Sequence, residues 1–252
     1  MESDWIPYSR ATNAGPCTCM VNTAQEPDAA RPSLTVCHVR FSEPGEHGVG
    51  THEEANSIDD AFEAGQERET SSSVFVARTR GGGKMSFYLY GPVADGPALE
   101  QRLRRDFGGR SVGIEHRDDP GWKLFAALLP SSAERQPAQD VRVVQTLQGH
   151  GDPLTPKRDV RHFAYFPTEE ASRRFAAYVG QQGFSVEART GPGELPFCII
   201  ASRDDSVTLD AITPITTSLC RQAELCGGDY DGWEAALVKP RGLLSRLLGR
   251  RG

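Results

Sequence analysis

The order of the elements predicted after residue 158 constrains the fold more than any other feature of the chain. Four apolar-rich segments, bounded by turn residues, have the length and pattern of strands: 161–166, 184–189, 195–202 and 230–238. The second and third are joined by Thr190-Gly191-Pro192-Gly193, which is a turn signal. The middle pair is therefore expected to form a hairpin.

Helical patterns fill the two remaining connections. Thr168 is placed to cap a helix with Glu169 and Glu170 in its first turn, and Gly183 is placed to end it. The second helix is expected to start with Asp210 as its N-cap, which puts Pro214 in the first turn. The predicted order is βαββαβ, and four strands covered on one face by two helices make a ferredoxin-like sandwich.

The first half is expected to be a second α+β domain with a mainly antiparallel sheet. Gly81-Gly82-Gly83 separates two strand-like segments and predicts a hairpin turn. Helices are expected over 59–68 and 98–107, and strands over 5–11, 17–23, 34–41, 73–80, 85–90, 112–116 and 122–129. The run of hairpin, helix and hairpin over 73–129 suggests a unit related to the second half.

Residues 131–140, SSAERQPAQD, are polar, contain Pro137 and are predicted to link the halves. We accordingly expect domains over 1–133 and 139–238, followed by a basic tail over 239–252. The tail sets leucines among arginines and has no acidic residue. Lipid, RNA or a groove on a partner are alternative ligands for such a segment, and disorder is the simpler expectation.

Charge and hydropathy exclude some classes of function. The chain carries a formal charge of −6, and residues 43–69 hold nine acids against one base. This acidity argues against direct nucleic-acid binding by the folded body. No apolar run reaches the ~20 residues of a membrane span. The first residues also lack the pattern of a signal peptide. We therefore expect a cytoplasmic protein without a stable membrane span, of undetermined oligomeric state.

No motif in the chain assigns a catalytic residue, a metal or a cofactor. The six cysteines are expected to be reduced, buried thiols, with Cys17-x-Cys19 near His38 as a weak alternative zinc site. His162 lacks a local partner that would orient it as a base, so a structural role is expected. His38 and His116 are interpreted in the same way.

The last strand contains Asp229-Tyr230-Asp231-Gly232-Trp233, and two interpretations stay open. Strict alternation places Tyr230 and Gly232 on one face and Asp231 and Trp233 on the other. The strand would then present interface-type aromatics beside a flat glycine. Alternatively, Trp233 belongs to the core and Gly232 forms a bulge.

Residues 141–238 resemble the regulator of ribonuclease activity B family. The likeness rests on Gly183-Phe184, on the closing Tyr230-Asp231-Gly232-Trp233, and on an earlier set that comprises Gly151-Asp152, Arg158, His162, Phe163 and Phe166. The resemblance implies a ferredoxin-like sandwich and a non-enzymatic inhibitor that binds ribonuclease E. The family's acidic stretch before the domain is missing here, and Asp204 and Asp205 remain after the third strand. The candidate partner-binding residues are Asp204, Asp205, Asp229, Tyr230, Asp231, Gly232 and Trp233.

The first half looks like the domain of unknown function numbered 695. The residues that carry this likeness are Trp5, Gly15-Pro16, Asp119-Pro120, Trp122 and Leu129-Pro130. This resemblance implies no activity.

The sequence favours a bacterial, non-enzymatic regulator of RNA metabolism. Its expected partner is a protein, with a ribonuclease E-type endoribonuclease as the suggested one. Two alternatives belong to other classes. One is an enzyme with a site between the domains, which needs clustered polar groups of perturbed pKa. The other is a small-molecule-sensing module, because fold alone does not choose a function.

Overall fold

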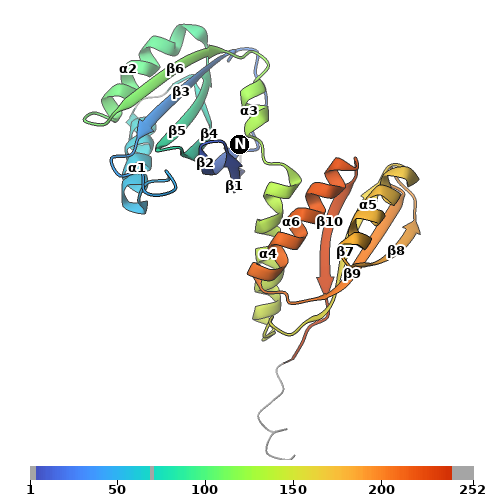
Figure 1. Cartoon of the computed structure of the whole chain (residues 1–252). Coiled ribbons are helices and arrows are strands. Elements are labelled where there is room, and N and C mark those ends of the chain that lie inside the picture. The colour runs from blue at the N-terminus through green and yellow to red at the C-terminus, as the bar shows by residue number, and fades with distance from the viewer. Residues whose placement is uncertain (1–3, 69–70, 240–252) are drawn as a thin grey trace, which may run out of the picture. The chain divides into compact units, whose positions relative to one another are not determined.

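The computed structural model describes residues 4–68 and 71–239, and the chain forms two compact units, Met1–Leu129 and Pro130–Gly252 (Figure 1). Except for Lys239, the predicted basic tail lies outside the described residues. Within those residues, no helix combines the length and the hydrophobicity that crossing a membrane requires.

The sheet of the C-terminal unit has the strand order β10-β7-β9-β8, with every neighbouring pair antiparallel. Its strands are β7 (Arg158–Phe166), β8 (Ser185–Thr190), β9 (Phe197–Asp205) and β10 (Asp229–Ala235). Together with α5 (Glu169–Gln181) and α6 (Leu209–Leu225), these strands run βαββαβ in sequence. The predicted ferredoxin-like sandwich is therefore confirmed.

The core of this unit lies between the sheet and the helices. Alternate residues of β7 are buried, and Ala164 and Phe166 pack with Phe175 and Val179 of α5 and Leu219 of α6. Thr168 caps α5 as expected, because its hydroxyl accepts from the Ala171 amide at 3.2 Å. The expected N-cap of α6 was wrong. The helix begins earlier, after Thr208, and keeps Pro214 in its interior.

The prediction of a linker over 131–140 was wrong, because these residues form the first half of α4 (Ser132–Gly149). Ser131 and Glu134 close a capping box, in which the Ser131 hydroxyl accepts from the Glu134 amide at 3.2 Å and Glu134 accepts from the Ser131 amide at 2.9 Å. These bonds satisfy two amides that the start of a helix leaves without partners. Helix α4 is longer than the helix predicted over 141–147, and it packs against α6 as a third helix of the C-terminal unit.

The sheet of the N-terminal unit has six strands in the order β1-β2-β4-β5-β3-β6, again antiparallel throughout. The strands are β1 (Trp5–Thr12), β2 (Gly15–Asn22), β3 (Ser33–Arg40), β4 (Val74–Gly81), β5 (Lys84–Gly91) and β6 (Val112–Asp118). The main helices are α1 (His52–Arg68) and α2 (Gly96–Asp106). The expected antiparallel α+β domain is confirmed.

From β3 to β6 the N-terminal unit repeats the plan of the C-terminal one. The elements run β3, α1, β4, β5, α2, β6, and the strand order β6-β3-β5-β4 corresponds to β10-β7-β9-β8. The hairpin of β1 and β2 extends this sheet beyond β4. The related unit thus begins at β3, earlier than the sequence suggested.

Residues 122–129 were predicted to be a strand but contain helix α3 (Lys123–Leu128). The Asp119 carboxylate accepts from the amides of Lys123 at 2.8 Å and Leu124 at 2.9 Å, which satisfies the first turn. Tyr90 donates a further hydrogen bond to Asp119 at 2.6 Å. A short apolar run has no period that separates strand from helix, and here the carboxylate selects the helix.

Candidate functional site

Tyr230 and Trp233 of β10 both face the helices, which excludes strict alternation along this strand and confirms the alternative interpretation, a core Trp233 with a bulge at Gly232. Tyr230 pairs with Ala164 and Trp233 with His162, and the register shifts between Tyr230 and Gly232. A bulge adds one residue on β10, which reverses the alternation of the residues after it. Gly232 has φ +117, a conformation that residues with a Cβ rarely adopt. The closing motif is therefore mainly a signature of this bulge.

The Trp233 ring, 8 % exposed, belongs to the core. Its Nε1 donates to Asp140 of α4 at 2.9 Å, and Asp140 is completely buried. Thr216 and Gln136 donate to the same carboxylate at 2.6 and 2.9 Å. Asp140 is therefore a hub that joins β10, α4 and α6. Three donors satisfy a charge that would otherwise be costly to bury.

His162 lies on the same buried face as Trp233. Its Nδ1 is 2.8 Å from the Tyr230 hydroxyl, and Nε2 has no hydrogen-bond partner among the described residues. Burial lowers the pKa of His162 to about 4, and burial, followed by the Asp140 charge, raises the pKa of Tyr230. A neutral, 1 % exposed imidazole packed against the Phe184 ring is a structural group.

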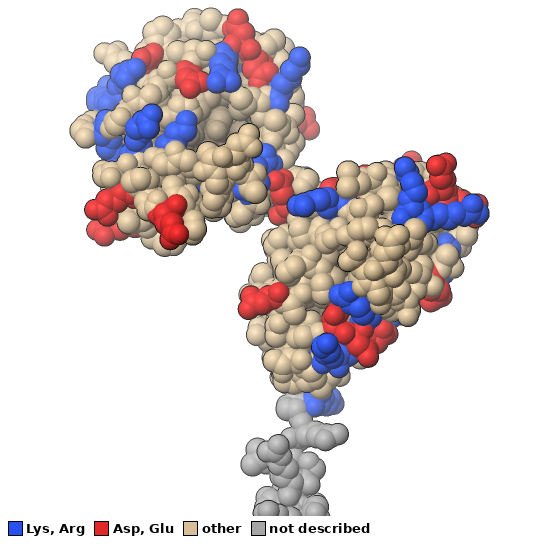
Figure 2. Space-filling view, viewed as in Figure 1, with Lys and Arg blue, Asp and Glu red and all other residues tan. Residues whose placement is uncertain are grey.

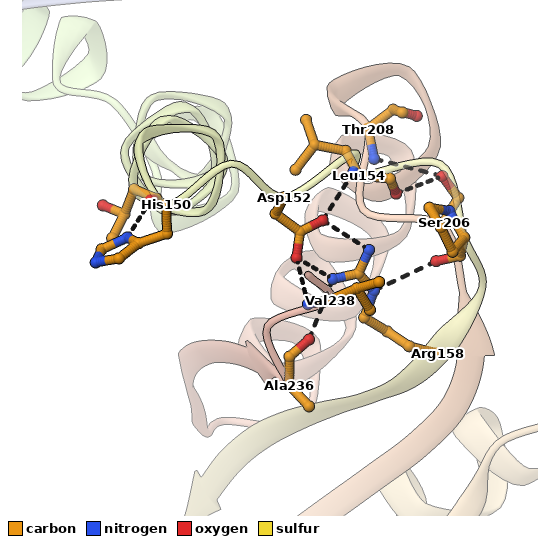
Figure 3. A network of polar contacts seen from close by, with 10 residues as sticks. His150, Asp152, Leu154, Arg158, Ser206, Thr208, Ala236 and Val238 are labelled. Atoms are coloured by element: carbon orange, nitrogen blue, oxygen red, sulfur yellow. Dashed lines mark hydrogen bonds and ion pairs between the residues drawn. The ribbon is translucent and has the colours of Figure 1, made fainter. Parts of the chain in front are cut away.

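A second buried network, drawn in Figure 3, closes the end of the sheet. Arg158 donates to both carboxylate oxygens of Asp152, at 2.5 and 2.9 Å, and to the carbonyl of Ala236 at 3.1 Å. Asp152 also accepts from the amides of Leu154 at 2.8 Å and Val238 at 2.7 Å. These contacts, led by Arg158, hold the pKa of Asp152 at about 2. The pair fixes the segment after β10 to the start of β7.

The other face of the sheet is not packed against the described helices, and we call it the open face. Phe163 and Tyr165 of β7 are partly exposed on it. Across the sheet, Phe163 pairs with Ile200 and Gly232, and Tyr165 pairs with Cys198 and Asp229. Because Gly232 has no side chain, nothing from β10 covers the Phe163 ring directly. The middle of the open face is therefore an aromatic surface.

Acidic side chains surround this aromatic centre. Cross-strand pairs share a face, and this places Asp159, Glu187, Asp204, Asp229 and Glu234 beside the aromatics. Asp231, the extra residue of the bulge, acts electrostatically on Tyr165 and Cys198 and is the sixth carboxylate. Arg161 and Arg189 are the two bases of the face. Two positive against six negative charges leave a formal surplus of four negative charges.

The sequence-predicted site residues separate into two groups. Asp204, Asp229 and Asp231 are exposed on the open face. The side chains of Tyr230 and Trp233 are buried, and Asp205 lies on the helix side, 2.8 Å from Arg203. Phe163 and Tyr165 were not predicted to be surface residues, although their alternation with Val160, His162 and Ala164 could have shown it.

On the face of each unit that Figure 2 shows, both basic and acidic side chains occur.

A line of polar side chains in the N-terminal unit joins Ser86 to His38 at 2.8 Å and His38 to Glu115 at 3.3 Å. The order serine, histidine, carboxylate matches the nucleophile, base and acid of a catalytic triad. Ser86 is only 2 % exposed, which leaves its hydroxyl out of reach of a substrate.

The cysteines and histidines do not assemble a metal centre in the part of the chain that is described. The Cys17 and Cys19 sulfurs are 3.9 Å apart, and no group of three or more His, Cys, Asp or Glu residues there could hold a metal ion. The hydrogen bond from Cys19 lowers the pKa of Cys17 to about 7. The six cysteines carry no disulfide.

Part of the chain matches a known protein family. Residues 138–235 match the family model described as regulator of ribonuclease activity B. This region contains all of β7 to β10, and with them the open face. No curated protein matches the chain.

Solved structures show only weak overall likeness. An unknown protein from Galdieria sulphuraria is 14 % identical, with 81 % of this chain and 98 % of that one covered and a TM-score of 0.24. A microcompartments protein from Desulfitobacterium hafniense is 12 % identical, with 85 % and 98 % covered and the same TM-score. Likenesses at this level carry no information about function.

Proposed function

We propose that the protein is a non-enzymatic regulator whose C-terminal unit binds a ribonuclease E-type endoribonuclease and reduces its cleavage of RNA. The observation that supports this most is the open face, an aromatic centre with a surplus of negative charge, inside the region that matches the ribonuclease-regulator model. The partner is a protein, and the folded body does not contact RNA.

The open face fits a basic protein segment. Phe163 and Tyr165 supply partly exposed aromatic area, the type of side chain that anchors protein interfaces. Arg161 lies 5.4 Å from the centre of the Phe163 ring and pairs with Glu234 at 2.8 Å, which orders the centre of the face. Exposed carboxylates at Asp204, Asp229 and Asp231 steer a cationic partner toward it.

The same charges argue against RNA as the direct ligand. Aromatic residues on the central strands of a four-stranded sheet can stack on bases. Such surfaces need basic side chains for the phosphates, because neutralising phosphate dominates the affinity for nucleic acid. The open face has the opposite sign, so a protein with a basic segment is the better match.

The proposal is tested by adding the purified full chain to ribonuclease E from the same organism and measuring the initial rate of RNA cleavage. We expect the rate to fall in a saturable way, with a stoichiometric complex on size-exclusion chromatography. Unchanged cleavage together with no complex, at micromolar concentrations and physiological salt, would exclude this ribonuclease as the partner.

A further inference from the structure

The N-terminal unit contains an aromatic cavity that the proposed function does not use. The cavity, about 520 Å³ in volume, lies between α1 and the strands β1, β2 and β4. Its aromatic walls are Trp5, Phe62 and Phe75, with ring centroids 4.9 Å apart for Trp5 and Phe75 and 4.7 Å apart for Phe62 and Phe75. We call it the α1 cavity.

Two carboxylates stand at the rim of the α1 cavity. Glu63 and Glu67 line it from α1, both are exposed, and neither has an ion-pair partner among the residues that the structure describes. Arg78 of β4 also lines the cavity, but its guanidinium is paired with Asp59 of α1. The charge that remains available at the cavity is therefore negative.

Aromatic rings beside free carboxylates match one chemical class of ligand. The face of an aromatic ring attracts a cation, most strongly for tryptophan, and a neighbouring carboxylate adds charge and hydrogen bonds. We propose that the α1 cavity binds an arginine or lysine side chain from a basic segment of a partner polypeptide.

A polypeptide fits better than an isolated amine because the negative charge continues beyond the cavity. Asp60 is exposed and, with Glu63 and Glu67, follows the 3- and 4-residue spacing that keeps side chains on one stripe of a helix. Such neighbours stand about 5–6 Å apart. Alternate residues of an extended chain stand about 6.5–7 Å apart on one side. Successive basic side chains can therefore face successive carboxylates.

The assignment goes beyond the proposed function and does not depend on it. The α1 cavity belongs to the N-terminal unit, outside residues 138–235, and shares no residue with the open face. A basic peptide can bind here even if the ribonuclease is not the partner of the C-terminal unit, and the two experiments report on different residues.

The test uses the full chain and a synthetic ten-residue peptide in which arginine alternates with glycine. Binding is measured by calorimetry and by tryptophan fluorescence at low and physiological salt. Trp5 is the reporter, because Trp122 and Trp233 are 1 % and 8 % exposed. The double variant Glu63→Gln/Glu67→Gln is compared with Glu46→Gln/Glu53→Gln, which removes two exposed acids elsewhere in the same unit.

We expect the peptide to change the Trp5 fluorescence. The Glu63→Gln/Glu67→Gln variant should bind the peptide about tenfold more weakly, because it loses the two carboxylates that pair with the cation beside the aromatic rings. The control variant should bind within about twofold of the parent. Equal weakening in both variants would show diffuse attraction to an acidic surface and overturn the site, as would the absence of binding. Spermidine binding as tightly as the peptide would overturn the polypeptide assignment. Adding Trp5→Leu to the Glu63→Gln/Glu67→Gln variant should abolish its remaining affinity for the peptide, as measured by calorimetry, with folding checked by circular dichroism.

Discussion

Trp233 of β10 and Asp140 of α4, 93 residues apart in the chain, are joined by a buried 2.9 Å hydrogen bond. Through this bond, Trp233 of the closing motif connects strand β10 to helix α4. The bulge in β10 turns both aromatics of the motif inward, and Asp229 and Asp231 remain at the surface. The open face, which we propose as the contact with a partner, is therefore distinct from the groups that hold the fold.

The Asp140 hub makes a first prediction about stability. Asp140→Ala leaves the Trp233 indole N–H and the Gln136 side-chain amide buried without their acceptor, and each such group costs about 1–3 kcal/mol. We expect the free energy of unfolding of the C-terminal unit to fall by about 3 kcal/mol. Urea denaturation followed by Trp233 emission measures it, with the exposed substitution Asp204→Asn as control. A loss no greater than that of the control would contradict the hub.

The Asp152–Arg158 pair predicts a defined dependence on pH. The pKa of Asp152 is about 2 in the folded protein, below its ordinary value of 3.8, so the ion pair stabilises the fold fully above pH 3.8. This stability is lost as the pH falls from 3.8 through 2, and it amounts to roughly 2 kcal/mol at one pKa unit per 1.36 kcal/mol. Stability measured between pH 6 and 2 should therefore drop in this window.

Removing one partner of this pair should do more damage than acid. Arg158→Met leaves the Asp152 carboxylate buried without its counterion, and such losses cost about 3–5 kcal/mol. The double variant Asp152→Asn/Arg158→Met leaves no buried charge and should recover part of the loss. Arg173→Met, at an exposed ion pair, is the control and should change stability by less than about 1 kcal/mol. Equal effects of the buried and the exposed substitution would refute the structural role.

His162 should oppose folding as the solution becomes acidic. Its folded-state pKa of about 4 is lower than the ordinary 6.5, so the unfolded chain binds a proton that the folded one does not. The protein is therefore expected to lose roughly 3 kcal/mol as the pH falls from 6.5 to 4. His162→Gln should flatten this part of the profile, and His150→Gln, at an exposed histidine of the same unit, should not. A profile unchanged by His162→Gln would rule the explanation out.

Gly232 allows a comparison between two glycines with equal space around them. At both Gly232 and Gly180 an added Cβ would meet nothing within 4 Å, but only Gly232 has a positive φ, at +117. Gly232→Ala should cost about 1–3 kcal/mol through backbone strain. Gly180→Ala, inside α5, should be neutral or stabilising. Thermal denaturation measures the melting temperatures of both variants. Similar melting temperatures would argue against a bulge that needs glycine.

Much of the fold followed from periodicity, and the failures have identifiable causes. The strand and helix patterns of residues 158–235 predicted βαββαβ correctly because each element has its own apolar face. Residues 123–128 were misassigned because a short apolar run suits either state, and the deciding contact comes from Asp119. Residues 131–140 were misread on polarity and Pro137, although Ser131 and Glu134 carry a capping-box spacing that predicts a helix start.

The candidate site was harder to predict than the fold. Along 229–233 the sequence allowed both strict alternation and a bulge at Gly232, and only the pairing with β7 decides between them. The position of Asp140 under Trp233 had no signal in either segment alone. By contrast, the exposure of Phe163 and Tyr165 follows from the alternation of β7 once its buried face is known.

In the function we propose, the open face contacts the ribonuclease. The triple variant Asp204→Asn/Asp229→Asn/Asp231→Asn removes three exposed charges from it. Glu170→Gln/Asp210→Asn/Glu194→Gln removes three exposed charges of the same unit outside it. Both triple variants should fold like the parent, because none of the six residues is buried.

The most direct measurement is the inhibition constant of each triple variant for RNA cleavage by the organism's own ribonuclease E. We predict that the open-face variant inhibits at least about tenfold more weakly than the parent, while the control variant stays within about twofold, as rim charges outside an interface do. Equal inhibition by the parent and both variants would contradict the open face as the contact surface.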